Sequence, residues 1–181
     1  IVQSGATFAA ESPRDFSSAI AKGNGTIITG QPLVVSVEAS TSDGAYNAGD
    51  TVLVTVTFSE NVTVTGTPQL TLETGSNDVV LTYLSGSGAA TLVFRYIVAS
   101  GHTSADLSYT STSALALSGE AKIRDNLVND GVLTLPVPGA TNSLKANKAL
   151  VIDTESPTAG TIRDGSSGSD VNYSSGNTSL T

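Results

Sequence analysis

The stretch from Asp50 to Val98 constrains the fold more than any other part of the chain. Four apolar side chains alternate there with Leu53, Thr55 and Thr57, and they are Val52, Val54, Val56 and Phe58. A period of two is typical of a β-strand with one buried face. The same alternation returns at Gln69–Glu73 and at 92–98, between turn signals. We therefore expect a sheet here, with the first strand ending in a turn at 59–61.

The rest of the chain repeats this pattern of short apolar runs separated by Gly, Ser, Asn and Asp. Further strands are expected near 33–37, 62–65, 79–84, 90–98, 107–109, 114–117, 132–135 and 150–153. Turn signals at this spacing favour an all-β, antiparallel sandwich. Near the start of the chain, Ser12 before Pro13 is compatible with a short helix from Pro13 to Lys22.

Changes in composition divide the 181 residues into three parts. Residues 1–31 are expected to be an N-terminal extension or the tail of a preceding domain, and 32–156 one complete sandwich. Alternation stops near Pro157, and 157–181 contains too few apolar residues to form a core. That last part is expected to be a linker and the first strand or strands of a following module.

Charge and composition exclude several classes of protein. Only 13% of the residues are charged, against about 25% in an average protein, and the net charge is −8. An acidic chain without a basic patch is not expected to bind nucleic acid. No apolar run reaches the ~20 residues that a membrane-spanning helix needs, so membrane insertion is not expected. Because Cys is absent, disulfides and thiolate metal sites are excluded.

Catalytic groups are sparse in the sequence. The only histidine, His102, lies in a Gly-Ser-Thr loop without an evident partner, and we interpret it as a solvent-exposed loop residue. Ser85–Gly88 is a turn between strands and lacks the context of a nucleophile elbow. The acidic residues are scattered at strand ends, which does not suggest a pair of catalytic carboxylates. We therefore expect no enzyme activity.

Oxygen-bearing side chains gather at two places that could hold calcium, which prefers several oxygen ligands from flexible loops. The first is one turn that contains Asp125, Asn126, Asn129 and Asp130. The second is the joint at Asp153 and Glu155, with Asp43 or Asp50 as further ligands from a neighbouring turn. At both places the alternative is a turn in which the side chains hydrogen-bond to the backbone, and the sequence leaves this choice open.

An ordered series of motifs resembles a known kind of repeat. The motifs are Asp43–Thr51, Val54–Val62, Gly66–Gly75, Ser85–Gly88, Thr91–Phe94, Asp106–Tyr109 and Ala149–Thr154. Together they are similar to the bacterial immunoglobulin-like, cadherin-like modules of large adhesins and fibrous surface proteins. Two positions depart from that pattern: Ser108 stands where the family often has a second acidic residue, and Val128-Asn129-Asp130 replaces a Gly-Asn-Asp turn. Residues 162–180 resemble the start of a fibronectin type III-like or lectin-like module.

The resemblance implies an immunoglobulin-like sandwich that acts outside a bacterial cell as a spacer or adhesive module, with calcium as its expected cofactor. Its expected partners are neighbouring modules or chains, and a glycan or a host or prey surface. Two alternatives remain open: a carbohydrate-binding module that uses tyrosines, and a subunit of a self-assembling layer or filament. In the latter, residues 159–181 would pair with the sheet edge of a neighbouring chain.

Overall fold

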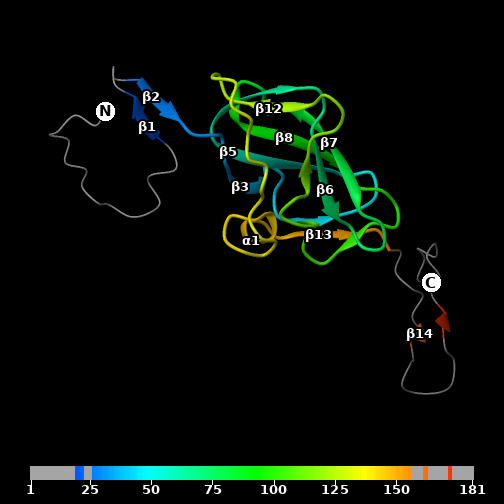
Figure 1. The fold of residues 1–181 in the computed structure, drawn as a ribbon. Helices are drawn as coiled ribbons and strands as arrows, with labels where there is room; N and C mark the ends of the chain where they lie inside the picture. The colour runs from blue at the N-terminus through cyan, green and yellow to red at the C-terminus, as the bar shows by residue number, and fades with distance from the viewer. Residues whose placement is uncertain (1–18, 23–25, 156–160, 163–170, 173–181) are drawn as a thin grey trace.

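The computed structural model describes residues 19–22, 26–155, 161–162 and 171–172, and over these ranges it shows an all-β protein (Figure 1). The strands are β1 Ala19–Lys22, β2 Thr26–Thr29, β3 Val34–Ala39, β4 Gly44–Tyr46, β5 Thr51–Thr65, β6 Gln69–Glu73, β7 Val79–Ser85, β8 Ala89–Ile97, β9 Thr103–Ser104, β10 Ser108–Tyr109, β11 Leu115–Ala116, β12 Lys122–Arg124, β13 Leu150–Asp153, β14 Thr161–Ile162 and β15 Val171–Asn172. One single-turn helix, α1, spans Leu144–Asn147.

Most of the strands form one curled antiparallel sheet. Its order is β10-β6-β7-β8-β5-β12, with β11 also paired to β6 and β3 also paired to β5. A second, smaller sheet has the order β4-β13-β9, in which β13 runs parallel to β4 and antiparallel to β9. The pairs β1-β2 and β14-β15 are separate two-stranded ladders.

The turn expected at 59–61 is wrong, because the long strand β5 continues through these residues. Residues 51–57 pair with β8 in regular register up to Thr57 and Thr91, and pairing resumes only at Val62 and Ala89. This shift marks a β-bulge, which absorbs the extra residues without ending the strand. Beyond the bulge, β5 exchanges β3 for β12 as its second neighbour. The polar residues at 59–61 therefore bend the strand and do not reverse the chain.

The alternating apolar residues form the core, as the period of two predicts. Val52, Val54, Val56 and Phe58 of β5 are at most 2% exposed, and Leu150 and Ile152 of the smaller sheet belong to the same cluster. Complete burial of such a side chain contributes about 1.5–3 kcal/mol. Both sheets therefore share one core within residues 30–155.

A single stretch of chain connects the edges of the two sheets. β9 pairs with β13, and a few residues later β10 pairs with β6 of the large sheet. Between them, the backbone N–H of Leu107 donates to the carbonyl of Leu150 at 2.8 Å. The segment 103–109 thereby holds the smaller sheet against the large one.

Two short elements differ from the sequence-based expectations. The helix expected at Pro13–Lys22 is wrong over Ala19–Lys22, which is strand β1, and 13–18 lie outside the described residues. β1 pairs with Thr26–Thr29, a run dominated by β-branched residues that favour strands. In contrast, α1 is not predicted by any periodicity, because it is one turn capped by the Ser143 side chain, which accepts from the N–H of Ala146.

The region expected as a strand at 132–135 forms only an isolated parallel bridge between Val132 and Leu33. Its Leu135 is nevertheless buried in the core. The apolar residues at this point are thus packed as predicted, but without a ladder of backbone hydrogen bonds.

The chain enters and leaves the core region at opposite ends. It enters at Gln31 and Leu33, whose side-chain amide and backbone N–H donate to the carbonyl of Asp130 and to the Ser59 hydroxyl. It leaves after β13 at Thr154, which contacts the loop that follows β8. The loop after β8 lies at the start of β5, because Ile97 pairs with Thr51. Ser59, at the entry point, comes eight residues later in β5, so the two points are about 26 Å apart at ~3.3 Å per residue. Figure 1 shows β3 beginning at one end of the sheets and β13 ending at the other.

Candidate functional site

The two predicted calcium-binding places lie at these two ends. The turn that contains Asp125, Asn126, Asn129 and Asp130 follows β12, beside the point where the chain enters. Asp153 and Glu155 lie at the end of β13, where the chain leaves. The structure therefore does not bring the two groups together into one site.

Asp125 organises the turn after β12. The residue is 4% exposed, and one carboxylate oxygen, Oδ1, accepts hydrogen bonds of 2.8 Å from the backbone N–H groups of Leu127 and Asn129. The other oxygen, Oδ2, accepts a 2.7 Å hydrogen bond from the Asn129 side-chain amide. The turn is thus of the hydrogen-bonded kind, in which an aspartate side chain binds the backbone a few residues ahead.

These hydrogen bonds decide the protonation of Asp125. Burial raises the pKa of its carboxyl group, but the hydrogen bonds from the side chain and backbone of Asn129 and from the backbone of Leu127 outweigh burial and lower the pKa below its ordinary value. The opposite holds for Glu60, whose pKa is raised by burial and by the negative charge of Asp125. The carboxylate of Asp125 is therefore stabilised by N–H donors.

The other two residues of the turn point to solvent or to a neighbour. Asn126 is exposed and lines a shallow hollow together with Glu60, Asn61 and Thr63. Asp130 forms an exposed ion pair with Arg124, with 2.6 Å between its Oδ1 and the arginine Nε. Oδ1 of Asp130 is therefore paired with Arg124.

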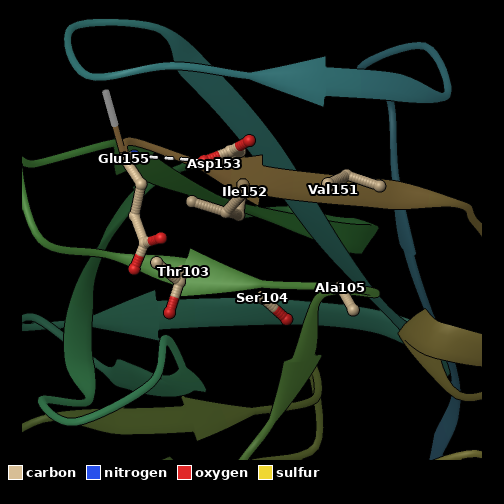
Figure 2. Close-up of a pocket in the computed structure, with 7 residues that line it drawn as sticks. All are labelled: Thr103, Ser104, Ala105, Val151, Ile152, Asp153 and Glu155. Carbon is tan, nitrogen blue, oxygen red and sulfur yellow. Dashed lines mark hydrogen bonds between the residues drawn. The ribbon is translucent and has the colours of Figure 1, made fainter. Parts of the chain in front are cut away.

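An open pocket of about 450 Å³ lies over the smaller sheet where the chain leaves (Figure 2). It is lined by Thr103, Ser104, Ala105, Val151, Ile152, Asp153 and Glu155. The lining combines the apolar residues Ala105, Val151 and Ile152 with two hydroxyl groups and two carboxylates. The sheet places these residues together because β9 and β13 are antiparallel neighbours, with Asp153 opposite Thr103.

The two carboxylates of this pocket do not converge. Oδ1 of Asp153 accepts a 3.1 Å hydrogen bond from the backbone N–H of Glu155. Figure 2 shows the Glu155 carboxylate turned toward Thr103 and the Asp153 carboxylate turned away from it. The suggested further ligands make interactions of their own: Asp43 forms an ion pair with Lys148, at 3.2 Å, and Asp50 accepts from the N–H of Asn47.

No group of three or more histidine, aspartate or glutamate side chains comes together as a metal site among the residues that the structure describes. Two buried oxygen atoms in this part of the chain lack a hydrogen-bond partner, and they are Oδ1 of Asp106 and Oγ of Ser108. They belong to the segment between the two sheets, which is also where Ser108 departs from the resembled repeat. Calcium binding stays a prediction of the sequence.

His102 is not a solvent-exposed loop residue, and that interpretation is wrong. Its ring is partly buried and stacks on Tyr96, with 5.7 Å between the ring centroids and 22° between the planes. Its Nδ1 atom lies 2.9 Å from the Tyr96 hydroxyl and 3.3 Å from the backbone nitrogen of Ala99. This contact was not predictable from local pattern, because Tyr96 lies on β8 and His102 lies in the loop that follows and turns back over it.

Thr154 is a second residue that sequence reasoning missed. Its hydroxyl oxygen accepts from the N–H of Gly101 and donates to the carbonyl of His102, both at 2.9 Å. This pair of hydrogen bonds attaches the end of β13 to the loop that carries His102. A threonine directly after a strand has many uses, so its position in the sequence does not reveal this one.

Tyrosines do not form an exposed platform in the described residues. Tyr96 and Tyr109 are at most 1% exposed, and Tyr46 and Tyr83 are partly buried. The hydroxyl of Tyr46 donates to the Ser42 carbonyl, and that of Tyr83 accepts from the N–H of Ser87. Tyr173 lies outside the described residues.

Comparisons with protein-family models, with curated proteins and with solved structures find no match to this chain. Over its described ranges, the chain has no helix that is both long and apolar enough to cross a membrane.

Proposed function

We propose that this protein is a non-catalytic structural module, an immunoglobulin-like β-sandwich that acts as a spacer in an extracellular bacterial fibre or adhesin. The motifs from Asp43 to Thr154 supply the bacterial surface setting, through their resemblance to repeated modules. The geometry supplies the mechanical part of the proposal.

One observation carries the proposal: the chain is held at opposite ends of a single core. Gln31 and Leu33 attach the incoming chain beside Ser59 and Asp130, and Thr154 attaches the outgoing chain beside His102. Modules connected in this way extend an array by nearly their full length. A module whose termini lay at the same end would instead fold the array back on itself.

The strands at the two ends also lie in a favourable direction for bearing force. β3 is hydrogen-bonded along its length to β5, and β13 lies between β4 and β9. A pull on residues 31 and 155 acts along these strands, so several hydrogen bonds must break together. Resistance to lengthwise force is what a spacer requires.

The side-chain chemistry agrees with a non-catalytic role. His102 uses Nδ1 in hydrogen bonds to Tyr96 and Ala99. Asp125 uses both carboxylate oxygens within its own turn. These two side chains thus serve the fold.

Single-molecule force spectroscopy tests the proposal on the full chain of 181 residues. We expect one cooperative unfolding event that releases about 40 nm, since an extended residue spans at most ~3.6 Å. Forced unfolding follows the unfolding rate, so the rupture force reports the barrier directly. The chain has no cysteine, which allows handles to be attached at chosen positions.

The control uses the same protein with another direction of pulling. Handles at Ser76 and Glu155 lie at one end of the sheets. The carbonyl of Thr74, two residues before Ser76, accepts from the N–H of Thr103, and Thr103 lies opposite Asp153, two residues before Glu155. Force between these points opens strands one hydrogen bond at a time, so the rupture force is expected to be clearly lower. Equal rupture forces in both directions would contradict a fold built to bear end-to-end load.

A further inference from the structure

Val128, in the turn after β12, is held in a strained backbone conformation. Its φ is +69°, in the left-handed region that glycine adopts freely but a β-branched residue rarely does. The turn imposes this conformation, because Oδ1 of Asp125 accepts from the N–H groups of Leu127 and Asn129 on either side of Val128. Strained residues of this kind concentrate at sites of contact with other molecules. A contact of the side chain therefore explains this valine better than the needs of the turn do.

Packing in the core does not account for the valine. Val128 is 65% exposed and the preceding Leu127 is 55% exposed, and neither belongs to the core cluster. Leu127 and Val128 together form what we call the apolar tip. The hydrogen bonds to Asp125 fix the turn, and a β-branched side chain has few rotamers, so the tip loses little conformational entropy when it binds. The apolar tip is thus suited to enter an apolar hollow of another molecule.

The open pocket over the smaller sheet provides such a hollow. Its apolar part is formed by Ala105, Val151 and Ile152, of which Ala105 and Val151 are exposed to solvent. Its volume of about 450 Å³ falls within the ~300–1,000 Å³ of pockets that enclose ligands. The pocket therefore has room for two aliphatic side chains.

The apolar tip and the pocket lie too far apart to meet within one molecule. The turn that carries the tip contacts Gln31 where the chain enters, and the pocket includes Glu155 where the chain leaves. These two ends are about 26 Å apart along β5 at ~3.3 Å per residue. Figure 1 shows β12, which leads into the turn, and the end of β13 on opposite sides of the sheets. The tip of one copy can therefore reach only the pocket of another copy.

The charges at the two ends permit this contact. Asp153 and Glu155 make the pocket acidic, and no cationic side chain is among its described lining residues. The charge of the buried Asp125 is stabilised by N–H donors inside its turn. The remaining ionisable groups near the tip balance one another, and they are Glu60, Lys122, Arg124 and Asp130. An acidic pocket therefore does not repel the tip.

We propose that a second copy of this chain binds at the pocket: the apolar tip of one copy inserts between Ala105 and Val151 of the next. Because the two surfaces differ, the contact is heterologous, and each copy keeps one tip or one pocket for a further copy. Association is therefore open-ended and gives a row of copies in place of a symmetric dimer. This inference goes beyond the proposed spacer function, since it joins separate chains without a covalent connection.

Analytical ultracentrifugation of the full chain at neutral pH measures the association. A contact of this small area is weak, so the average mass is expected to rise with concentration up to about 1 mM. Val128→Gly is expected to lower the association constant about tenfold, as for the loss of one buried valine side chain. The same variant is expected to keep or raise the melting temperature, because relief of left-handed strain offsets the flexibility of glycine.

Val137→Gly is the matched control for loss of an exposed valine. Val137 is 62% exposed and lies outside both the turn and the pocket. The association of this variant is expected to equal that of the wild type. An equal loss in Val128→Gly and Val137→Gly would contradict a specific role of the apolar tip.

A mixing experiment distinguishes insertion of the tip from other modes of association. The double variant Leu127→Ser, Val128→Gly lacks the tip but keeps the pocket, whereas Ala105→Gln keeps the tip and fills the pocket with a longer side chain. Each is expected to be monomeric alone. An equal mixture has one matching tip and pocket, so it is expected to form dimers and no larger species.

Three results would overturn the inference. The first is a wild-type chain that stays monomeric up to about 1 mM. The second is association that persists in both the tip and the pocket variants, which would place the contact on another surface. The third is an equal mixture of the two variants that stays monomeric. None of these results bears on the spacer function, because rupture force is measured on single chains.

Discussion

The phenol of Tyr109 donates a 2.6 Å hydrogen bond to the backbone carbonyl of Pro136, 27 positions further along the chain. Tyr109 lies on β10, and its side chain is 1% exposed, so this bond forms away from water. Burial raises the pKa of Tyr109 to about 12, which keeps the hydroxyl protonated as a donor. The bond fixes the irregular segment around Pro136 to the edge of the large sheet.

Replacing this tyrosine, Tyr109→Phe, is expected to destabilise the protein by about 1–2 kcal/mol, because the Pro136 carbonyl loses its donor. Urea unfolding measures the change, and the slope m is expected to stay constant because the fold is unchanged. Tyr83→Phe is the matched control, since the Tyr83 hydroxyl only accepts from the N–H of Ser87 in an exposed turn. An equal loss in both variants would contradict the special role of the Tyr109 hydroxyl.

The turn after β12 is expected to make stability depend on pH through Asp125. Burial raises the pKa of its carboxyl group, but the hydrogen bonds from Asn129 and Leu127 bring it below the ordinary 3.8. The folded state therefore prefers the carboxylate, and its contribution to the free energy of unfolding is complete above pH 3.8. It is lost as the pH falls below 3.8 and through the lower pKa of the folded state.

Asp125→Asn removes this titration and is expected to cost about 1–3 kcal/mol at pH 7, because a neutral amide replaces a carboxylate that accepts three hydrogen bonds. Its unfolding free energy is also expected to vary less below pH 3.8 than that of the wild type. Asp78→Asn, at an exposed position, serves as the control. Parallel acid profiles for wild type and Asp125→Asn would refute this account.

The hairpin between β7 and β8 provides two glycines for comparison. At Gly86, φ is +111°, and an added Cβ would overlap the carbonyl oxygen of Thr91 and lie 2.9 Å from the Cα of Leu92. At Gly88, φ is +90°, but nothing lies within 4 Å of the added atom. Gly88→Ala is therefore expected to cost about 1–2 kcal/mol from backbone strain alone.

Gly86→Ala is expected to cost clearly more than Gly88→Ala, because the backbone of β8 must also move. Thermal unfolding of the two variants under identical conditions measures the difference. Similar melting temperatures would show that the hairpin shifts freely at Thr91.

Calcium is expected to leave the melting temperature unchanged, in contrast to the expectation from the sequence. A calcium ion bound by Asp125 would have to displace three hydrogen bonds, and the carboxylates of Asp153 and Glu155 point apart. Thermal unfolding in millimolar calcium and in chelator, at matched ionic strength, makes the comparison. A ligand at a hundredfold excess over its dissociation constant would add about 2.7 kcal/mol to the free energy of unfolding. The resulting rise in melting temperature is large enough to measure.

A clear rise in the melting temperature with calcium would reverse that expectation. Asp125→Asn and Asp153→Asn would then locate the ion, since only the variant that removes a ligand abolishes the rise.

Alternation along single strands predicted the all-β class and the core because burial of one face of a strand is a local property of sequence. It identified Val52 to Phe58, Gln69–Glu73 and Leu150–Asp153 as strands. Alternation could not predict the bulge in β5, because a polar triplet fits a turn and a bulge equally well. β4 and β12 were missed because each is only three residues long.

The contacts at the two ends were beyond sequence reasoning for a different reason. Asp125 was identified because its partners are two and four residues away. His102 and Thr154 are connected across 52 positions, and Tyr96 meets His102 only because the loop after β8 turns back. Such pairs depend on how the sheets are assembled, which the order of residues along one strand does not encode.

The parallel pairing of β4 with β13 has a consequence for the order of events in biosynthesis. Asp43 and Ala149, at the start of this pairing, are 106 positions apart. Loop-closure entropy makes such distant contacts slow to form. A chain that appears from its N-terminus cannot complete its smaller sheet until Leu150 to Asp153 has emerged, so Leu107 and the edge of β9 stay without partners until then. β13, the last strand of the core region, thus acts as the closing step of folding, and a chain truncated before Leu150 is expected to remain open and prone to degradation.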